Sequence, residues 1–232
     1  MYFLAVGGGF EPPIPCGMLV FKTSALDLSA IPPYYDGQNT LFSLPWRQRF
    51  IGRHSMKLEG LVHATVCFPL NNRGEALIGR KTRIIGIGLY NGPGGGIEKN
   101  ESIDEATVRE VREETGIKID PRHLERRAVV YCHNYKKDGV TPFDCKLFVS
   151  MAPVWQGTPR PSDEFIDLRW VAPIDLPVNE MMAGDRDWVP QVLAGKTLAA
   201  EVWYAPGMMR LDKPTRIEPR TQEELNRSWV IP

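Results

Sequence analysis

The chain has 232 residues, of which 43% are hydrophobic and 24% are charged, and its 28 Lys and Arg residues balance 28 Asp and Glu residues. This composition is typical of a globular protein, and the length allows one substantial domain with extensions, or two small domains. The balanced charge disfavours a long nucleic-acid track, and no apolar run approaches the ~20 residues that span a bilayer.

The first 55 residues differ in character from the rest of the chain. Prolines interrupt every apolar run, and Gly7 to Gly9 add flexibility. Two interpretations compete: a poorly ordered extension, or a segment that wraps around the domain through aromatic residues such as Tyr34 and Trp46. We favour the extension, because so interrupted a segment buries little apolar surface to offset the entropy lost on ordering. A conventional domain begins at Met56. The upstream part can therefore also be interpreted as a mis-assigned start of the protein.

Two signals bear on the cellular compartment. The opening MYFLAV is too short for a signal-peptide core and lacks a basic start. The cysteines are widely spaced and form no CxxC pair: Cys16, Cys67, Cys132 and Cys145. We therefore expect buried free thiols in a cytoplasmic protein.

Several segments predict strands because they are rich in β-branched and aromatic residues and are bounded by turn residues. They are residues 61–68, 75–81, 128–134, 144–152, 165–171, 197–204 and 208–211. Asn71 to Gly74 supply one turn and Asp138-Gly139 another. Residues 84–90 form a glycine-punctuated loop, and the polar tail from Lys213 is expected to be loose.

Two helices are predicted between these strands. Ser102 followed by Glu105 predicts a capping box at the start of the first helix, and Gly116 suits its left-handed end. The second helix covers residues 185–193, with Pro190 inside it and Gly195 after it. Strands on both sides of one helix predict an α/β (α+β) fold with a mixed β-sheet between helices. We assign residues 56–218 to this domain and residues 219–232 to a C-terminal tail.

The first helix carries an unusual set of carboxylates. Glu113 and Glu114 lie three and four positions after Glu110, so the three side chains can converge, while Val108, Val111 and Thr115 fall on a packing face. Carboxylates held so close repel one another, and a cation relieves the repulsion. The alternative is a solvated face of ordinary ion pairs, but this leaves the triple glycine at 94–96 and the capped start unexplained.

The spacing from the glycine turn to the helix end resembles the Nudix box. Its fixed positions are filled by Gly95, Glu101, Arg109, Glu110, Val111, Glu113, Glu114, Gly116 and Ile117. The segments ALIGRKTRIIGIGLYNGPGGGIE, QGTPRPSDEFIDLRWVAPIDLP, DRDWVP and AEVWY are similar to MutT-type members of this family. The resemblance implies a Nudix fold, an α/β/α sandwich, and hydrolysis of a nucleoside diphosphate linked to another group.

The resemblance also implies a metal site and its neighbours. The implied ligands of Mg²⁺, for which Mn²⁺ is a possible substitute, are Glu110, Glu113, Glu114, the carbonyl of Gly94, and Glu164 from the later loop. Arg109 is expected to orient carboxylates with Glu101 as its partner. The general base stays open between Glu110 and Glu164, since either could reach an activated water.

Base recognition is the part where the resemblance is incomplete. Asn91 and Asp185 stand where MutT-type enzymes for oxidised purines hydrogen-bond the base, but Gly184 replaces a second Asp. Met182 takes the place of a stacking Trp, and a flexible thioether can still lie against a purine. Lys81 is expected to steer the triphosphate, and Gly95 and Gly96 let the backbone approach the substrate.

These features together predict a magnesium-dependent hydrolase of oxidised purine nucleoside triphosphates such as 8-oxo-dGTP, which yields the monophosphate and pyrophosphate and cleans the nucleotide pool. The alternatives are a Nudix enzyme for ordinary dNTPs, ADP-ribose or a dinucleotide, and a Nudix module that binds without cleaving. The expected partner is a small nucleotide, with no nucleic-acid polymer and no membrane, and the oligomeric state stays open.

Overall fold

The computed structural model describes residues 60–83, 85–134, 143–205 and 209–231. All of them belong to one compact unit, Met56–Pro232. The predictions for residues 1–55, for the start at Met56 and for the Asp138-Gly139 turn lie outside the described residues. No helix in the described ranges is long and apolar enough to cross a membrane.

Two sheets form the framework of the described unit. The larger has the strand order β1-β5-β4-β7-β8, with β1 parallel to β5, β4 parallel to β7, and the other neighbours antiparallel. The smaller has the order β3-β2-β6 and is antiparallel. The bounds of the strands are β1 Gly60–Pro69, β2 Ala76–Lys81, β3 Tyr90–Asn91, β4 Glu125–Asn134, β5 Phe143–Ala152, β6 Phe165–Val171, β7 Leu198–Tyr204 and β8 Leu211–Pro219. The predicted mixed sheet is confirmed.

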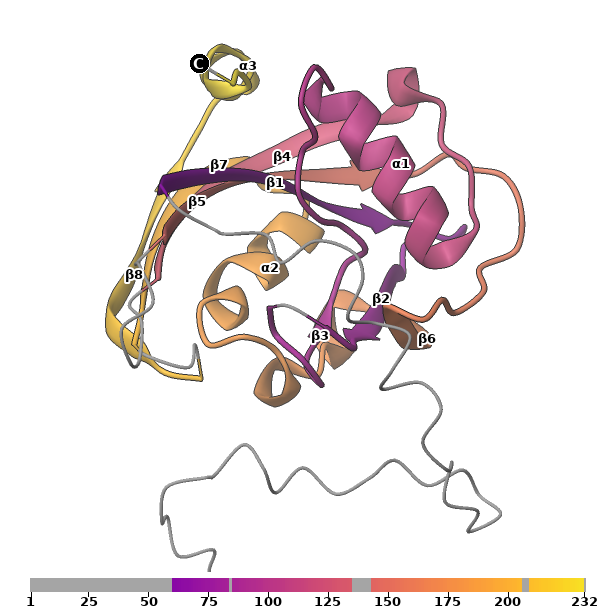
Figure 1. The fold of residues 1–232 in the computed structure, drawn as a ribbon, viewed down its shortest axis with the longest axis horizontal. Coiled ribbons are helices and arrows are strands. Elements are labelled where there is room, and N and C mark those ends of the chain that lie inside the picture. Colours follow the sequence, from indigo (N-terminus) through magenta and orange to yellow (C-terminus); the bar gives the residue numbers. More distant parts are fainter. Residues whose placement is uncertain (1–59, 84, 135–142, 206–208, 232) are drawn as a thin grey trace, which may run out of the picture. The chain divides into compact units, whose positions relative to one another are not determined.

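Helices lie on both faces of the larger sheet, with α1 on one side and α2 on the other (Figure 1). The α-helices are α1 Ile103–Thr115, α2 Asp185–Leu193 and α3 Gln222–Ser228, and short 3-10 turns occupy Pro121–His123, Pro173–Asp175 and Val178–Glu180. Val129 and Phe148 pack toward α1 and α3, whereas Val130 packs with Trp188 of α2. Because successive side chains of a strand point to opposite faces, one sheet supplies both cores of an α/β/α sandwich.

The helix α1 begins and ends as its sequence predicts. The Glu105 N–H donates to Ser102 Oγ at 3.2 Å, and the Ser102 N–H donates to the Glu105 carboxylate at 2.9 Å, so the capping box is present. Gly116 follows the helix with φ 75°, a left-handed conformation that glycine adopts most easily because it has no Cβ. Val111 and Thr115 are buried, and Val108 is partly buried against the same cluster as Val111, which confirms the packing face.

The prediction of a loose tail from Lys213 is wrong. The last strand does not end at Leu211 but begins there, and it is followed by α3, whose Leu225 has 0% of its surface exposed. Thr221 and Glu224 form a second capping box. A seven-residue helix gives a weak periodic signal, and the polar composition of this stretch favoured a tail. The assignment of residues 56–218 to one domain stays a prediction.

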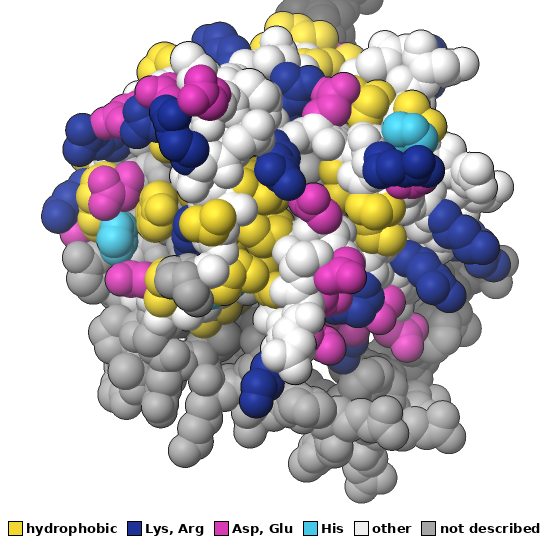
Figure 2. Space-filling view, turned by 90° about the horizontal axis from the view of Figure 1, so that it is seen from above, with side chains coloured by type: hydrophobic (Ala, Val, Ile, Leu, Met, Phe, Trp, Pro, Cys, Tyr) yellow, Lys and Arg dark blue, Asp and Glu magenta, His cyan; other side chains and the backbone are white. Residues whose placement is uncertain are grey.

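Trp229 packs this C-terminal segment against the face of the larger sheet that carries α1. Its indole N–H donates to Asp104 Oδ1 at 3.2 Å, and its ring meets Phe148 edge-on with centroids 5.2 Å apart. The guanidinium of Arg126 lies 5.3 Å from the centre of the same ring. Seen from above (Figure 2), acidic and basic side chains are intermixed over this side of the molecule, with apolar side chains between them.

Candidate active site

The glycine turn before α1 lies directly against β1. The Thr65 N–H donates to the Gly95 carbonyl at 2.8 Å, so the turn is bonded to β1 much as a neighbouring strand would be. A Cβ on Gly94 would come within 2.1 Å of the Thr65 carbonyl oxygen, and a Cβ on Gly95 within 2.7 Å of the Glu110 carboxylate. Gly94 is therefore required by the close approach of two backbone segments, whereas a side chain at Gly95 would have to displace the Glu110 carboxylate.

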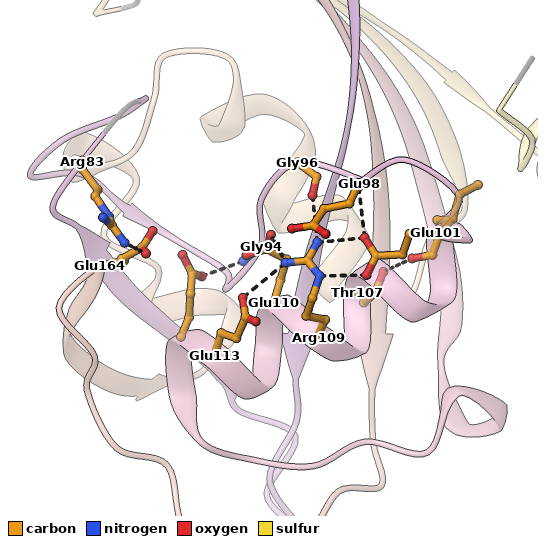
Figure 3. A network of polar contacts seen from close by, with 12 residues as sticks. Arg83, Gly94, Gly96, Glu98, Glu101, Thr107, Arg109, Glu110, Glu113 and Glu164 are labelled. Carbon is orange, nitrogen blue, oxygen red and sulfur yellow. Dashed lines mark hydrogen bonds and ion pairs between the residues drawn. The ribbon is translucent and has the colours of Figure 1, made fainter. Parts of the chain in front are cut away.

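Arg109 connects most of the polar groups on this side of α1 (Figure 3). Its Nε and Nη2 donate to the two oxygens of Glu101 at 2.7 and 2.9 Å, which is the predicted partnership in bidentate form. Nη1 donates to Glu110 at 2.7 Å and to Glu113 at 3.2 Å, and Nη2 also donates to the Gly96 carbonyl at 3.0 Å. One guanidinium thus fixes the positions of two of the predicted metal ligands.

The third helix carboxylate, Glu114, points in another direction. It is 4% exposed and accepts a hydrogen bond from the Gly94 N–H at 2.7 Å. The Lys81 ammonium lies 3.5 Å from the other Glu114 oxygen and donates to the Gly94 carbonyl at 2.8 Å. Lys81 therefore places a positive charge between two of the predicted metal ligands.

Burial alters the acidity of these carboxylates. It raises the pKa of Glu114 to about 7, although Lys81 and the Gly94 N–H favour the ionised form. Burial also raises the pKa of Glu110, against the opposing hydrogen bond from Arg109. The same guanidinium lowers the pKa of Glu101. Two desolvated carboxylates side by side need positive charge nearby.

The described part of the chain holds no ready-made cluster of three or more His, Cys, Asp or Glu side chains close enough for a metal ion. The carboxylates of α1 face Arg109 and Lys81 instead. The donor set nevertheless fits a hard divalent cation, because it consists of carboxylates and a backbone carbonyl, the oxygen ligands that such a cation prefers. The predicted ligand set stays a prediction.

Glu164 lies apart from the acidic helix. Its carboxylate forms an ion pair with Arg83, and Figure 3 shows the two side chains pointing at each other away from Glu110 and Glu113. Its side chain is 42% exposed. The structure does not bring Glu164 to the α1 carboxylates, so its role as ligand or base stays a prediction.

A cavity of about 160 Å³ opens beside the glycine turn. It brings together all the residues predicted to bind substrate: Lys81, Asn91, Gly95, Gly96, Met182 and Asp185. Sequence reasoning missed several polar residues of its wall: Thr65, Cys132, Asn134, Cys145 and Tyr204. The alternation along 128–134 was a usable signal, because it places Cys132 and Asn134 on one face of β4.

Asp185 is the most deeply buried acid of this cavity. It is 2% exposed, and Oδ1 accepts a hydrogen bond from the Tyr204 hydroxyl at 3.4 Å. Burial raises its pKa to about 7, while the Tyr204 hydroxyl and the nearby Trp188 indole act in the opposite direction. Oδ2 has no partner at normal hydrogen-bond distance. The protonation of Asp185 therefore changes near neutral pH.

The raised pKa of Asp185 predicts a pH-dependent stability. Since the unfolded chain releases this proton near pH 4 and the folded chain near pH 7, the free energy of unfolding falls as pH rises between these values. Asp185→Asn removes this contribution, and its free energy of unfolding relative to wild type should rise by roughly 2 kcal/mol from pH 5 to pH 8. Urea unfolding at both pH values measures it, and a constant difference would contradict the prediction.

The sequence and the fold are similar to those of known proteins. The NUDIX domain family matches residues 60–192. An oxidized purine nucleoside triphosphate hydrolase of Danio rerio is 31% identical over 124 residues, covering 53% of this chain and 74% of that protein. The phosphatase NudJ of Escherichia coli K12 is 36% identical over 112 residues, covering 47% of this chain and 68% of that protein. The crystal structure of a mutator MutT protein from Bacillus halodurans has a TM-score of 0.57 at 27% identity, covering 69% of this chain and 99% of that one.

Fold and site together define a pyrophosphohydrolase of the Nudix type. The chain belongs to the NUDIX family, whose match spans more than half of its length. The predicted Nudix fold is thereby confirmed. Members of this family generally use a divalent metal such as Mg²⁺ and bind small nucleotide substrates.

Proposed function

We propose that this protein hydrolyses purine nucleoside triphosphates, oxidised forms such as 8-oxo-dGTP among them, to the monophosphate and pyrophosphate. The observation that carries the proposal is the continuity of one cavity. Asn91 and Asp185 line it together with Lys81 and the glycine turn, which itself lies against Glu110. A base held by the first two would place its phosphate chain toward the acidic helix. The similarity to the Danio rerio enzyme supports the same choice.

The residues that line the cavity offer different chemistry. Asn91 Oδ1 accepts from the Gly92 N–H at 2.8 Å, which leaves its amide N–H₂ group for a ligand acceptor. Met182 supplies an apolar, polarizable wall for a ring. Lys81 supplies a positive charge for phosphate oxygens. We therefore assign base binding to Asn91, Asp185 and Met182, and phosphate binding to Lys81, Gly95 and Gly96.

Glu110, Glu113, Glu114 and the Gly94 carbonyl are the groups that would hold Mg²⁺, with Glu164 as a further ligand. A divalent cation bound there would neutralise charge on the phosphate oxygens. Arg109 keeps Glu110 and Glu113 in place through its contacts with Glu101, so it acts as a positioning residue. The proton of the attacking water is taken by Glu110 or by Glu164, and this choice stays open.

A small ligand suits the surface better than a polymer. The face seen in Figure 2 intermixes acidic and basic side chains, whereas a nucleic-acid polymer requires a continuous basic track. The cavity of about 160 Å³ is also of a size that admits one flat ring.

A second candidate is hydrolysis of another nucleoside diphosphate derivative, such as an ordinary dNTP, ADP-ribose or a dinucleotide. Gly184 and Met182 favour it, because they remove a carboxylate and a stacking ring that discriminate oxidised purines in the MutT-type enzymes. A base that loses one such hydrogen bond is bound less selectively.

A substrate panel at fixed Mg²⁺ separates the two candidates. Pyrophosphate or phosphate release is measured for 8-oxo-dGTP, dGTP, dATP, ADP-ribose and a diadenosine polyphosphate, each with an EDTA control. We expect the highest kcat/KM for a purine triphosphate, with 8-oxo-dGTP above dGTP. An equal kcat/KM for 8-oxo-dGTP and dGTP would refute the preference for oxidised bases, and a clear lead for ADP-ribose or the dinucleotide would establish the second candidate.

A further inference from the structure

Asn134, the last residue of β4, is a buried polar group that the proposed function has not yet used. It is 6% exposed and lines the cavity that holds Asn91 and Asp185. Its Nδ2 donates to the Cys132 carbonyl at 3.4 Å, which turns Oδ1 the other way, and Oδ1 has no hydrogen-bond partner. A buried carbonyl oxygen without a hydrogen-bond donor lowers stability, so a ligand that donates to Oδ1 would gain binding free energy.

The position of Asn134 is tied to that of Asp185. Asn134 is the register partner of Tyr204 in β7, and the Tyr204 hydroxyl donates to Asp185 Oδ1. Asp185 Oδ2 also lacks a partner at normal hydrogen-bond distance. Two unused acceptor oxygens therefore belong to residues that Tyr204 connects, and both residues line one cavity.

The part of this wall that β4 and β5 supply beside Asn134 is only weakly polar. Cys132 is on the same face of β4 as Asn134, and its register partner Cys145 is on β5. Burial raises the pKa of Cys145 to about 12 and that of Cys132 well above its usual range, so both stay neutral thiols. Besides the Thr65 hydroxyl and the Asn91 amide, the oxygens of Asn134 and Asp185 are thus two unpartnered acceptors that this cavity offers to the donors of a base.

We propose that Asn134 determines base specificity, its Oδ1 accepting a hydrogen bond from the exocyclic amino group of a guanine-type base. This inference rests on the proposed function and deepens it. A guanine edge presents two adjacent donors, the ring N–H and the amino group, to match Asn134 and Asp185. An adenine edge presents a donor beside an acceptor, so one carbonyl or carboxylate oxygen would face a ring nitrogen lone pair. Oxidation at C8 leaves the two guanine donors unchanged.

The test compares dGTP with dITP, which differs only by the missing amino group. Wild type should show a kcat/KM for dGTP about tenfold above that for dITP, because a site built to accept an amino proton disfavours a substrate without one. In Asn134→Leu, which has similar volume and no acceptor, the ratio should fall to about one while dITP is still hydrolysed. The change should appear in KM, since a contact made equally in ground and transition states leaves kcat unaltered.

Two further variants serve as a control and as a replacement in this comparison. Cys132→Ala changes the same face of β4 without removing an acceptor side chain, so it should keep the wild-type ratio. If Asn134→Leu unfolds at assay temperature, as judged by its circular dichroism, Asn134→Ala replaces it with the same expectation.

Three outcomes would overturn the assignment. A wild-type enzyme with equal kcat/KM for dGTP and dITP does not recognise the amino group. An Asn134→Leu or Asn134→Ala enzyme that keeps the full preference reads it through another residue. A wild-type enzyme that hydrolyses neither dGTP nor dITP nor 8-oxo-dGTP in the presence of Mg²⁺ refutes the proposed function itself, and the role of Asn134 falls with it.

Discussion

Replacing Glu113 by glutamine is expected to reduce kcat by roughly 10²–10³-fold while the melting temperature stays close to that of wild type. The side chain is 60% exposed and its one described contact is the 3.2 Å hydrogen bond from Arg109, so folding depends on it little. Catalysis depends on its charge if it holds a divalent cation, because a neutral amide is a much weaker ligand. Steady-state kinetics at saturating Mg²⁺, together with thermal unfolding, measure both quantities.

The control is a carboxylate with the same local environment on another helix. Glu223 of α3 is 81% exposed and pairs with Arg227 four residues later, as Glu113 pairs with Arg109 four residues earlier. Glu223→Gln should leave kcat unchanged. Full turnover by Glu113→Gln would remove this residue from the catalytic set and would favour a module that binds nucleotides without cleaving them.

Trp229→Ala should produce the largest loss of stability that we predict. Trp229 is 6% exposed, packs on Phe148 and donates to Asp104, so truncation removes both a large apolar surface and a hydrogen bond. Large-to-small changes of this kind cost about 3–5 kcal/mol. For a unit of this size the melting temperature should fall by about 10 °C. Differential scanning calorimetry measures the change.

The neighbouring Val230 provides a matched control, because it is 54% exposed. Val230→Ala should shift the melting temperature by no more than about 1–2 °C, as expected for a surface substitution. If Trp229→Ala has the same melting temperature as wild type, the C-terminal segment does not contribute to the stability of the folded unit.

Local signals predicted the elements that depend on local interactions. The capping box at Ser102, the glycine after α1 and the bounds of α2 at residues 185–193 all follow from residues within a few positions of each other. β8 and α3 were missed because their stability comes from distant partners. Leu225 is buried against Val129 and Phe148, which no window of neighbouring residues contains.

The site shows the same division between local and distant information. The helix carboxylates could be placed from spacing alone, but their separate environments could not. Glu114 is turned inward by the Gly94 N–H, and Lys81 comes from β2 to meet it. Asn134 escaped notice because its unpartnered Oδ1 is a property of the assembled cavity. The pairing of Glu164 with Arg83 likewise links positions far apart in the chain.

The strand order has a practical consequence for expressing the domain. The family match ends at residue 192, whereas β7 lies between β4 and β8 in the larger sheet. A fragment cut at the end of that match would leave β4 as an unpaired edge and would strip α3 from Val129 and Phe148. Unpaired edges and newly bared apolar patches promote aggregation. Soluble expression therefore requires the chain to continue through Trp229.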